Sequence, residues 1–158
     1  MMKIQMKPLL ICLAIPLLVG GLAALLTHKA MDSFNALNQP PLSPPGWLFP
    51  VAWTLLYLLM GLGCYMIWQA NPEPVYKKRA FIWYGVQLGL NFLWPLAFFL
   101  LGWHLPAFFL LLAILAAASY MAIQFHRIDK TAGLIQIPYL AWLVFAAYLN
   151  AGVWLLNG

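Results

Sequence analysis

The sequence predicts an all-α membrane protein: a bundle of five transmembrane helices that forms one domain over residues 1–158. Two observations lead to this prediction. Hydrophobic residues make up 65% of the chain and charged residues only 7%, which is too little polar surface for a soluble domain of this size. The hydrophobic residues also gather in five uncharged runs, each long enough to cross a bilayer, at about residues 8–27, 46–69, 80–101, 105–125 and 131–156.

The basic residues predict how these helices are oriented. With five crossings, the N-terminus and the second and fourth connections share one side of the membrane, and the other side contains only Lys29. The positive-inside rule places the basic side in the cytoplasm. We therefore expect the N-terminus inside, in a bacterial inner membrane, with a bacterial or mitochondrial outer membrane as the alternative. The residues on the basic side are Lys3, Lys7, Lys77, Lys78, Arg79, Arg127 and Lys130.

The first run is expected to stay in the protein as a helix. It is longer than a signal peptide requires and lacks a small-residue cleavage site at its end. The segment from Thr27 to Pro45 is then the only long connection, and it faces outward. Cys12 and Cys64 lie at similar depths on the reducing side, where we expect no disulfide and a space-filling role. Because the basic residues sit in short connections, the net charge of +5 does not indicate nucleic-acid binding.

The second run combines a proline-rich start with an aromatic stripe. Trp53, Tyr57 and Gly61 follow each other at intervals of four, so they share one face of a helix. Trp47 and Trp68 lie at the two ends of the run, where tryptophan is typical of the membrane interface. Trp53 and Tyr57 lie deeper, and their face is therefore predicted to contact something other than lipid.

The third run has a polar face. Gln87, Asn91, Trp94 and Phe98 recur at helical spacing, and amides inside a bilayer are costly unless they face the bundle. Pro95 adds to this polarity, because a proline ring displaces the carbonyl four residues earlier, which here is that of Asn91.

The opposite face of the third run presents Gly85 and Gly89, a G-x-x-x-G pair. Such pairs allow membrane helices to approach closely. Because the polar face is directed inward, we expect this glycine face to meet a second subunit and to form a homodimer. Packing within the bundle is the alternative.

The fifth run continues the aromatic and polar pattern. Tyr139, Trp142, Ala146 and Asn150 recur at intervals of three and four, and Pro138 predicts a kink near the inner end. At 1.5 Å per residue, the polar and aromatic positions of the three helices lie about 10–20 Å from the outer boundary. They predict a pocket beneath the long connection for a flat, largely apolar ligand. The alternative is that these side chains only hold the helices together.

Three motifs resemble a known family. They read W-x-F-P-x-x-W-T-x-L-Y-x-x-M-G from Trp47 to Gly61, Q-L-x-L-N-x-x-W-P from Gln87 to Pro95, and I-P-Y-L-A-W from Ile137 to Trp142. This set is similar to the translocator protein family, also called TspO/MBR. Its bacterial members are tryptophan-rich sensory proteins and its animal members are peripheral-type benzodiazepine receptors. By this resemblance the chain is identified as a bacterial member.

The resemblance implies a receptor-like or sensory membrane protein whose pocket is closed by the first connection. The implied ligands are porphyrins, haem, sterols and benzodiazepine-type compounds, and no cofactor is required. The implied roles are tetrapyrrole handling and stress sensing. Trp53 and Trp142 match the two indoles that the family places against a porphyrin, and they are the candidate catalytic residues if the chain degrades porphyrin in light. With Gln87 and Tyr139 added from their helix faces, the predicted ligand-binding residues are Trp53, Tyr57, Gln87, Asn91, Trp94, Tyr139, Trp142, Ala146 and Asn150.

The chain departs from the family pattern at three places. The family usually has tryptophan and tyrosine where this chain has Ser33 and Phe34, and tryptophan where it has Leu42. The first connection is therefore less aromatic. No lysine or arginine follows Tyr148, so the sterol-recognition pattern at the end of the fifth helix is incomplete.

The sequence offers little for acid–base or metal chemistry. Asp32, Glu73 and Asp129 are the only acidic residues, and all lie in predicted connections, so no carboxylate pair reaches the bilayer interior. The absence of an ionisable residue within a span also argues against proton-coupled transport. His28 and His104 lie at the outer ends of predicted helices. Each could ligate haem or serve as an ordinary capping residue, and both alternatives stay open. We predict no metal site. Three functions remain as alternatives: a receptor, a light- and oxygen-dependent porphyrin-degrading enzyme, and a lipid or sterol carrier.

Overall fold

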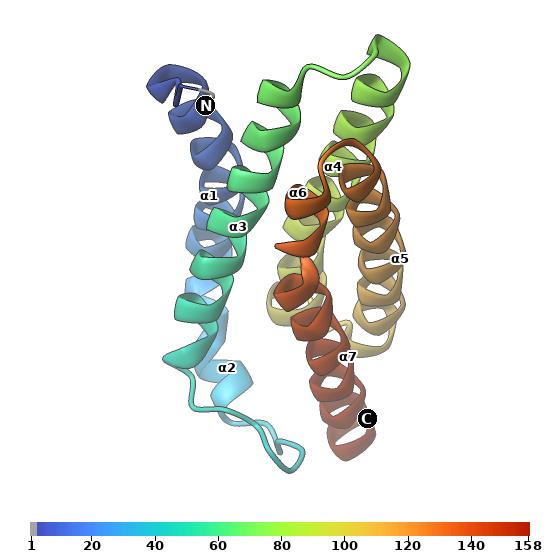
Figure 1. Cartoon of the computed structure of the whole chain (residues 1–158). Coiled ribbons are helices and arrows are strands. Elements are labelled where there is room, and N and C mark those ends of the chain that lie inside the picture. Colours follow the sequence, from blue (N-terminus) through green and yellow to red (C-terminus); the bar gives the residue numbers. More distant parts are fainter. Residues whose placement is uncertain (1–2) are drawn as a thin grey trace.

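The protein is a bundle of long helices, shown in Figure 1 as a computed structural model that describes residues 3–158. Five of the helical segments in this range are long and apolar enough to cross a membrane. This confirms the predicted all-α membrane fold. The long helices are α1 (Met6–Thr27), α3 (Leu48–Ala70), α4 (Pro74–Pro95), α5 (His104–Ile128) and α7 (Ile137–Asn157), and the short ones are η1 (His28–Ala30), α2 (Met31–Asn35), η2 (Leu96–Leu100) and α6 (Lys130–Leu134).

The two ends of the bundle differ. The start of α1, the α3–α4 connection and the turn between α5 and α6 lie together at one end, the upper end of Figure 1. The C-terminus and the loop that leads into α3 lie at the other end. This arrangement is what an odd number of crossings requires.

Helices α1 and α3 approach each other closely at Gly61. A Cβ atom at this position would lie 2.6 Å from the carbonyl oxygen of Cys12 and 2.8 Å from the Cα of Leu13. Only glycine therefore fits here, and the stripe that contains Gly61 does contact protein rather than lipid. Cys12 and Cys64 are both buried, and no disulfide joins them.

Two helix ends lie well outside the predicted ranges, by six residues or more. The first helical segment continues beyond Thr27 through η1 and α2, so the outer loop begins only at residue 36. Helix α4 begins at Pro74, six residues before the predicted start, because proline fits the first turn, where its missing N–H is not needed. The basic residues at 77–79 therefore lie within the helix. Their long charged side chains can extend to the membrane interface.

Proline shapes two of the long segments. After Pro95 the backbone continues as the wider turn η2, in which the N–H of Leu101 bonds to the carbonyl of Leu96. Near Pro138, where a kink was predicted, the helical segment is interrupted for two residues. Helix α6 ends at Leu134, and Pro138 occupies the first turn of α7. Gln136 lies at this break, fully buried, and its Nε2 donates to the carbonyl of Leu59 on α3.

Candidate ligand-binding site

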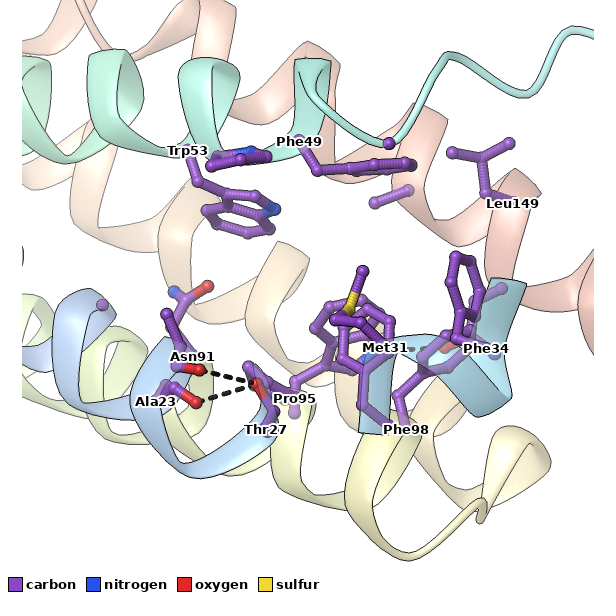
Figure 2. A pocket seen from close by; sticks show the side chains of 18 of the residues that line it. Ala23, Thr27, Met31, Phe34, Phe49, Trp53, Asn91, Pro95, Phe98 and Leu149 are labelled. Carbon is purple, nitrogen blue, oxygen red and sulfur yellow. Dashed lines mark hydrogen bonds between the residues drawn. The ribbon is translucent and has the colours of Figure 1, made fainter. Parts of the chain in front are cut away.

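A cavity of about 310 Å³ lies at the loop end of the bundle. Its walls come from α1, α3, α4 and α7, together with α2, η2 and the loop at residues 36–47. Figure 2 shows Phe49 and Trp53 on one side of the open space, with Thr27, Pro95 and Phe98 on the other. The volume falls in the usual range for small-molecule sites, and a mostly apolar wall with few polar groups is typical of them.

Trp53 stands at the centre of the aromatic wall. Its ring centroid lies 5.6 Å from that of Tyr57, 6.5 Å from that of Trp94 and 6.4 Å from that of Trp142. The planes of Trp53 and Trp142 are almost perpendicular, at 86°. Edge-to-face packing at these separations is favourable for indole rings. The two indoles that sequence analysis singled out therefore meet in one wall, although they come from helices α3 and α7.

A second group of rings forms the part of the wall nearest the loop. Trp94 stacks on Phe98 with centroids 5.1 Å apart, and Phe99 packs edge-on against Phe98. Phe34 completes the group, at 5.1 Å from Phe99 and 5.7 Å from Phe98. Position 34 thus still supplies an aromatic ring to the cavity. Leu42, by contrast, does not line the cavity and is 84% exposed.

Behind the aromatic wall lies a buried hydrogen-bond network. The Nδ2 of Asn91 donates to the Gln87 carbonyl at 2.8 Å and to the hydroxyl of Tyr139. That hydroxyl donates in turn to the Gln87 Oε1 at 2.7 Å. Asn91 lines the cavity, whereas Gln87 and Tyr139 are fully buried outside its wall. The network joins α4 to α7 and fixes the orientation of the Asn91 amide.

A second polar link ties three helices together at the cavity. The indole Nε1 of Trp94 donates to Asn150 Oδ1 at 3.0 Å, and Asn150 Nδ2 donates to the carbonyl of His104 at 2.7 Å. Both polar atoms of the Asn150 amide are therefore engaged. The ring of His104 packs against Phe98, whereas His28 lines the cavity.

Trp142 carries an unpaired donor. Its Nε1 is buried, and it forms no hydrogen bond with any residue in the described range 3–158. A buried N–H without a partner costs about 1–3 kcal/mol. The ring is held by packing instead, edge-on to Phe49 at 6.0 Å and against Phe145 at 5.7 Å. This N–H is a donor at the cavity wall that has no protein partner within residues 3–158.

All but two of the predicted ligand-binding residues lie in the cavity wall, and the exceptions are Gln87 and Tyr139. The wall also contains residues that sequence analysis did not predict. Helix α1 supplies a stripe of small side chains opposite the aromatic wall. At Gly20 an added Cβ would overlap the ring of Tyr57, so this glycine makes room for the tyrosine. The stripe consists of Gly20, Ala23, Ala24 and Thr27. The helical spacing of these small residues is the sequence signal that could have predicted it.

Gly85 and Gly89 lie on the outer surface of α4. A Cβ atom at either position would have no neighbour within 4 Å. The alternative in which these glycines pack inside the bundle is therefore wrong. Within residues 3–158, no group of three or more His, Cys, Asp and Glu side chains is placed to hold a metal ion.

Comparison with known proteins identifies the family of this chain. The TspO/MBR family matches residues 12–155. The chain is 34% identical to "Tryptophan-rich protein TspO" of Archaeoglobus fulgidus over 142 residues, which cover 89% of this chain and 91% of that protein. It is 38% identical to the "Translocator protein" of Bos taurus over 147 residues, covering 89% and 84% of the two chains. It is 31% identical to "Tryptophan-rich protein TspO" of Chlorobaculum tepidum, with 99% of each chain covered.

These relatives come from an archaeon, a mammal and a bacterium. Their similarity to the chain lies in one narrow range, so it does not assign the chain to the bacterial branch that the motifs suggested. The coverage of each chain is high, and five helical segments of this chain are long and apolar enough to cross a membrane. The protein is a multi-pass membrane protein and belongs to the TspO/MBR family.

Proposed function

We propose that this protein is a receptor-like membrane protein that binds porphyrins or haem in the cavity, for tetrapyrrole handling or stress sensing. The observation that carries the proposal is the wall made by Trp53 and Trp142, whose rings lie 6.4 Å apart. A flat conjugated ligand gains most from indole surfaces of this kind. Sterols and benzodiazepine-type compounds are smaller apolar candidates for the same space.

The polar atoms near the cavity suggest how such a ligand would be oriented. The unpaired Nε1 of Trp142 would gain an acceptor from a ligand carboxylate or ring nitrogen after a small rotation of the indole. His28, at the outer edge of the wall, is the imidazole that would be available to the iron of haem. Gln87 and Tyr139 act through Asn91, which they hold in place, and they are positioning residues in this proposal.

Light-dependent porphyrin degradation is a second candidate function. The observation that favours it is the proximity of three indoles, since Trp53 lies within 6.5 Å of both Trp94 and Trp142 by centroid. In this function the excited porphyrin and oxygen supply the reactivity, and Trp53 and Trp142 are the redox-active side chains. A lipid or sterol carrier would use the same cavity without either reaction.

A titration of purified protein with protoporphyrin in the dark, followed by illumination, tests these functions. Saturable binding in the dark with an unchanged porphyrin spectrum after illumination supports the receptor. A photoproduct that forms with the wild type but not with Trp53→Phe or Trp142→Phe supports the enzyme. No saturable binding of porphyrin or haem would contradict both functions, and binding of sterol alone would support the carrier.

The proposal places the N-terminus on the inner side of the membrane, as the charge distribution indicates. It also includes a homodimer through the open face of Gly85 and Gly89. Space for a second helix on this face supports the dimer, because close backbone contact is a principal source of helix association in lipid.

A further inference from the structure

The loop at residues 36–47, here called the lid, is bonded to the last turns of α7. The hydroxyl of Tyr148 donates to the carbonyl of Pro41 at 2.6 Å. Asn157 forms two bonds with the backbone of Asn38: its Nδ2 donates to the Asn38 carbonyl at 2.8 Å, and its Oδ1 accepts from the Asn38 N–H at 3.0 Å. Gln39 and Gly46 of the lid line the cavity. The lid therefore covers the cavity, and α7 holds it there.

Gly152, which lies between Tyr148 and Asn157 in the sequence, provides a third contact between α7 and the lid. A Cβ atom at Gly152 would lie 2.5 Å from the Cβ and 2.6 Å from the Cγ of Pro40. Pro40 is buried, and its ring occupies the space that a side chain at position 152 would fill. Tyr148, Gly152 and Asn157 are called the latch below.

The lid also contains a strained residue. Leu42 has a φ of +68°, in the left-handed region that residues other than glycine, asparagine and aspartate rarely adopt. Its side chain is 84% exposed, so no packing of that side chain compensates for the strain. Such a conformation persists only where neighbouring contacts fix the backbone. The neighbouring contact here is the bond from Tyr148 to Pro41, the residue directly before Leu42.

We propose that the latch holds the lid closed over a bound hydrophobic ligand, and that the strain at Leu42 acts against the latch. The balance between the two sets how often the lid opens and how long a ligand stays. The part of this inference that concerns the ligand rests on the proposed function. Tyr148 is then a positioning residue for the lid, whereas the sterol-recognition pattern would have made it a ligand contact.

Hydrogen exchange of the lid in the ligand-free protein tests the latch directly, because amides in a lid exchange when it opens. Tyr148→Phe removes one hydrogen bond and should raise lid exchange by about 3- to 10-fold. Leu42→Asn relieves the strain, because asparagine tolerates the left-handed region, and should lower exchange by roughly 3-fold. Tyr76→Phe is the matched control, since Tyr76 is an exposed tyrosine at the opposite end of the bundle, and it should change nothing in the lid.

The opposite signs make the result decisive. Faster lid exchange in Tyr148→Phe together with slower exchange in Leu42→Asn supports the latch. Unchanged lid exchange in these two variants, or a change in the same direction in both, overturns it. Loss of protection throughout the bundle in Tyr148→Phe would show a general structural role and would also overturn it.

Protoporphyrin release, measured by stopped flow, tests the part that concerns the ligand. Release should be faster from Tyr148→Phe and slower from Leu42→Asn, in the same order as the exchange rates. If the exchange rates follow this order but the release rates do not, the ligand leaves by another route. That result would overturn the claim about ligand release. If porphyrin does not bind at all, the proposed function fails and the claim about release fails with it, whereas the exchange rates still decide the latch.

Discussion

The indole Nε1 of Trp94 donates to the Oδ1 of Asn150 at 3.0 Å, and this bond joins α4 and α7 beside the cavity. Asn150 is 1% exposed, and its other amide atom donates to the carbonyl of His104 at the start of α5. One side chain thus holds three helices at the level where the ligand would bind. It lines the cavity, yet its amide is already engaged by protein.

Replacing Asn150 with leucine should therefore lower stability. The change leaves the Trp94 N–H without a partner and removes the bond to the His104 carbonyl, at a cost of about 1–2 kcal/mol in a membrane protein. Thermal unfolding in detergent measures the effect. Asn35→Leu is the control, because Asn35 is exposed at the end of α2. Equal melting temperatures for wild type and Asn150→Leu would show that the bond contributes little.

Gly20 and Gly21 offer a test of the unpredicted α1 wall. Gly20→Ala places a methyl group against the ring of Tyr57 and should push that ring into the cavity. We expect a loss of about 1–3 kcal/mol in stability from overpacking and weaker porphyrin binding. Gly21→Ala is the matched control. Its Cβ would meet nothing within 4 Å, so the better helix propensity of alanine should leave the protein equally or more stable.

The dimer prediction depends on the outer face of α4. Gly89→Leu should separate two α4 helices by a few ångströms, because it removes the close backbone approach that glycine allows, and it should yield monomers by light scattering in mild detergent. Porphyrin binding should persist, since this face lies away from the cavity. Gly21→Leu, on an equally open face of α1, should not change the oligomeric state. A dimer that survives Gly89→Leu must use another helix.

The orientation can be read with thiol labelling. A cysteine added after Gly158 should react with an impermeant reagent applied outside spheroplasts, whereas a cysteine in place of Lys77 should not. The native Cys12 and Cys64 are buried and should contribute little background. The reverse pattern would show that the excess of basic residues near the N-terminal end does not face the cytoplasm, or that the protein occupies a different membrane.

Much of the fold and part of the site follow from periodicity in the sequence. Intervals of three and four identified the faces that contain Trp53, Asn91 and Trp142, and these faces do turn inward. Periodicity gives the face of a helix but not the depth at which a cavity begins. Gln87 and Tyr139 share faces with cavity residues and yet lie behind the wall, because they are placed deeper along their helices.

Other features carried too weak a signal in the sequence. The small side chains of α1, such as Gly20 and Ala23, are neither polar nor aromatic, so a run of them looks like any lipid-facing helix. At the interruption before Pro138, the Nε2 of Gln136 donates to the backbone of Leu59 on another helix, and long-range contacts of this kind are not visible in local patterns. The latch on the lid likewise joins residues more than a hundred positions apart.

The central claim, that Trp142 belongs to a porphyrin-binding wall, is tested most directly by a tryptophan-quenching titration of wild type, Trp142→Phe and Trp103→Phe with protoporphyrin. Trp103 is 57% exposed and lies outside the cavity wall. Because Nε1 of Trp142 has no partner among the described residues, its removal should cost the free protein no hydrogen bond. The bound state should lose stacking area and a donor. The account predicts binding weaker by about 1 kcal/mol or more, roughly fivefold in Kd, for Trp142→Phe and unchanged binding for Trp103→Phe. Equal affinity for wild type and Trp142→Phe would contradict it.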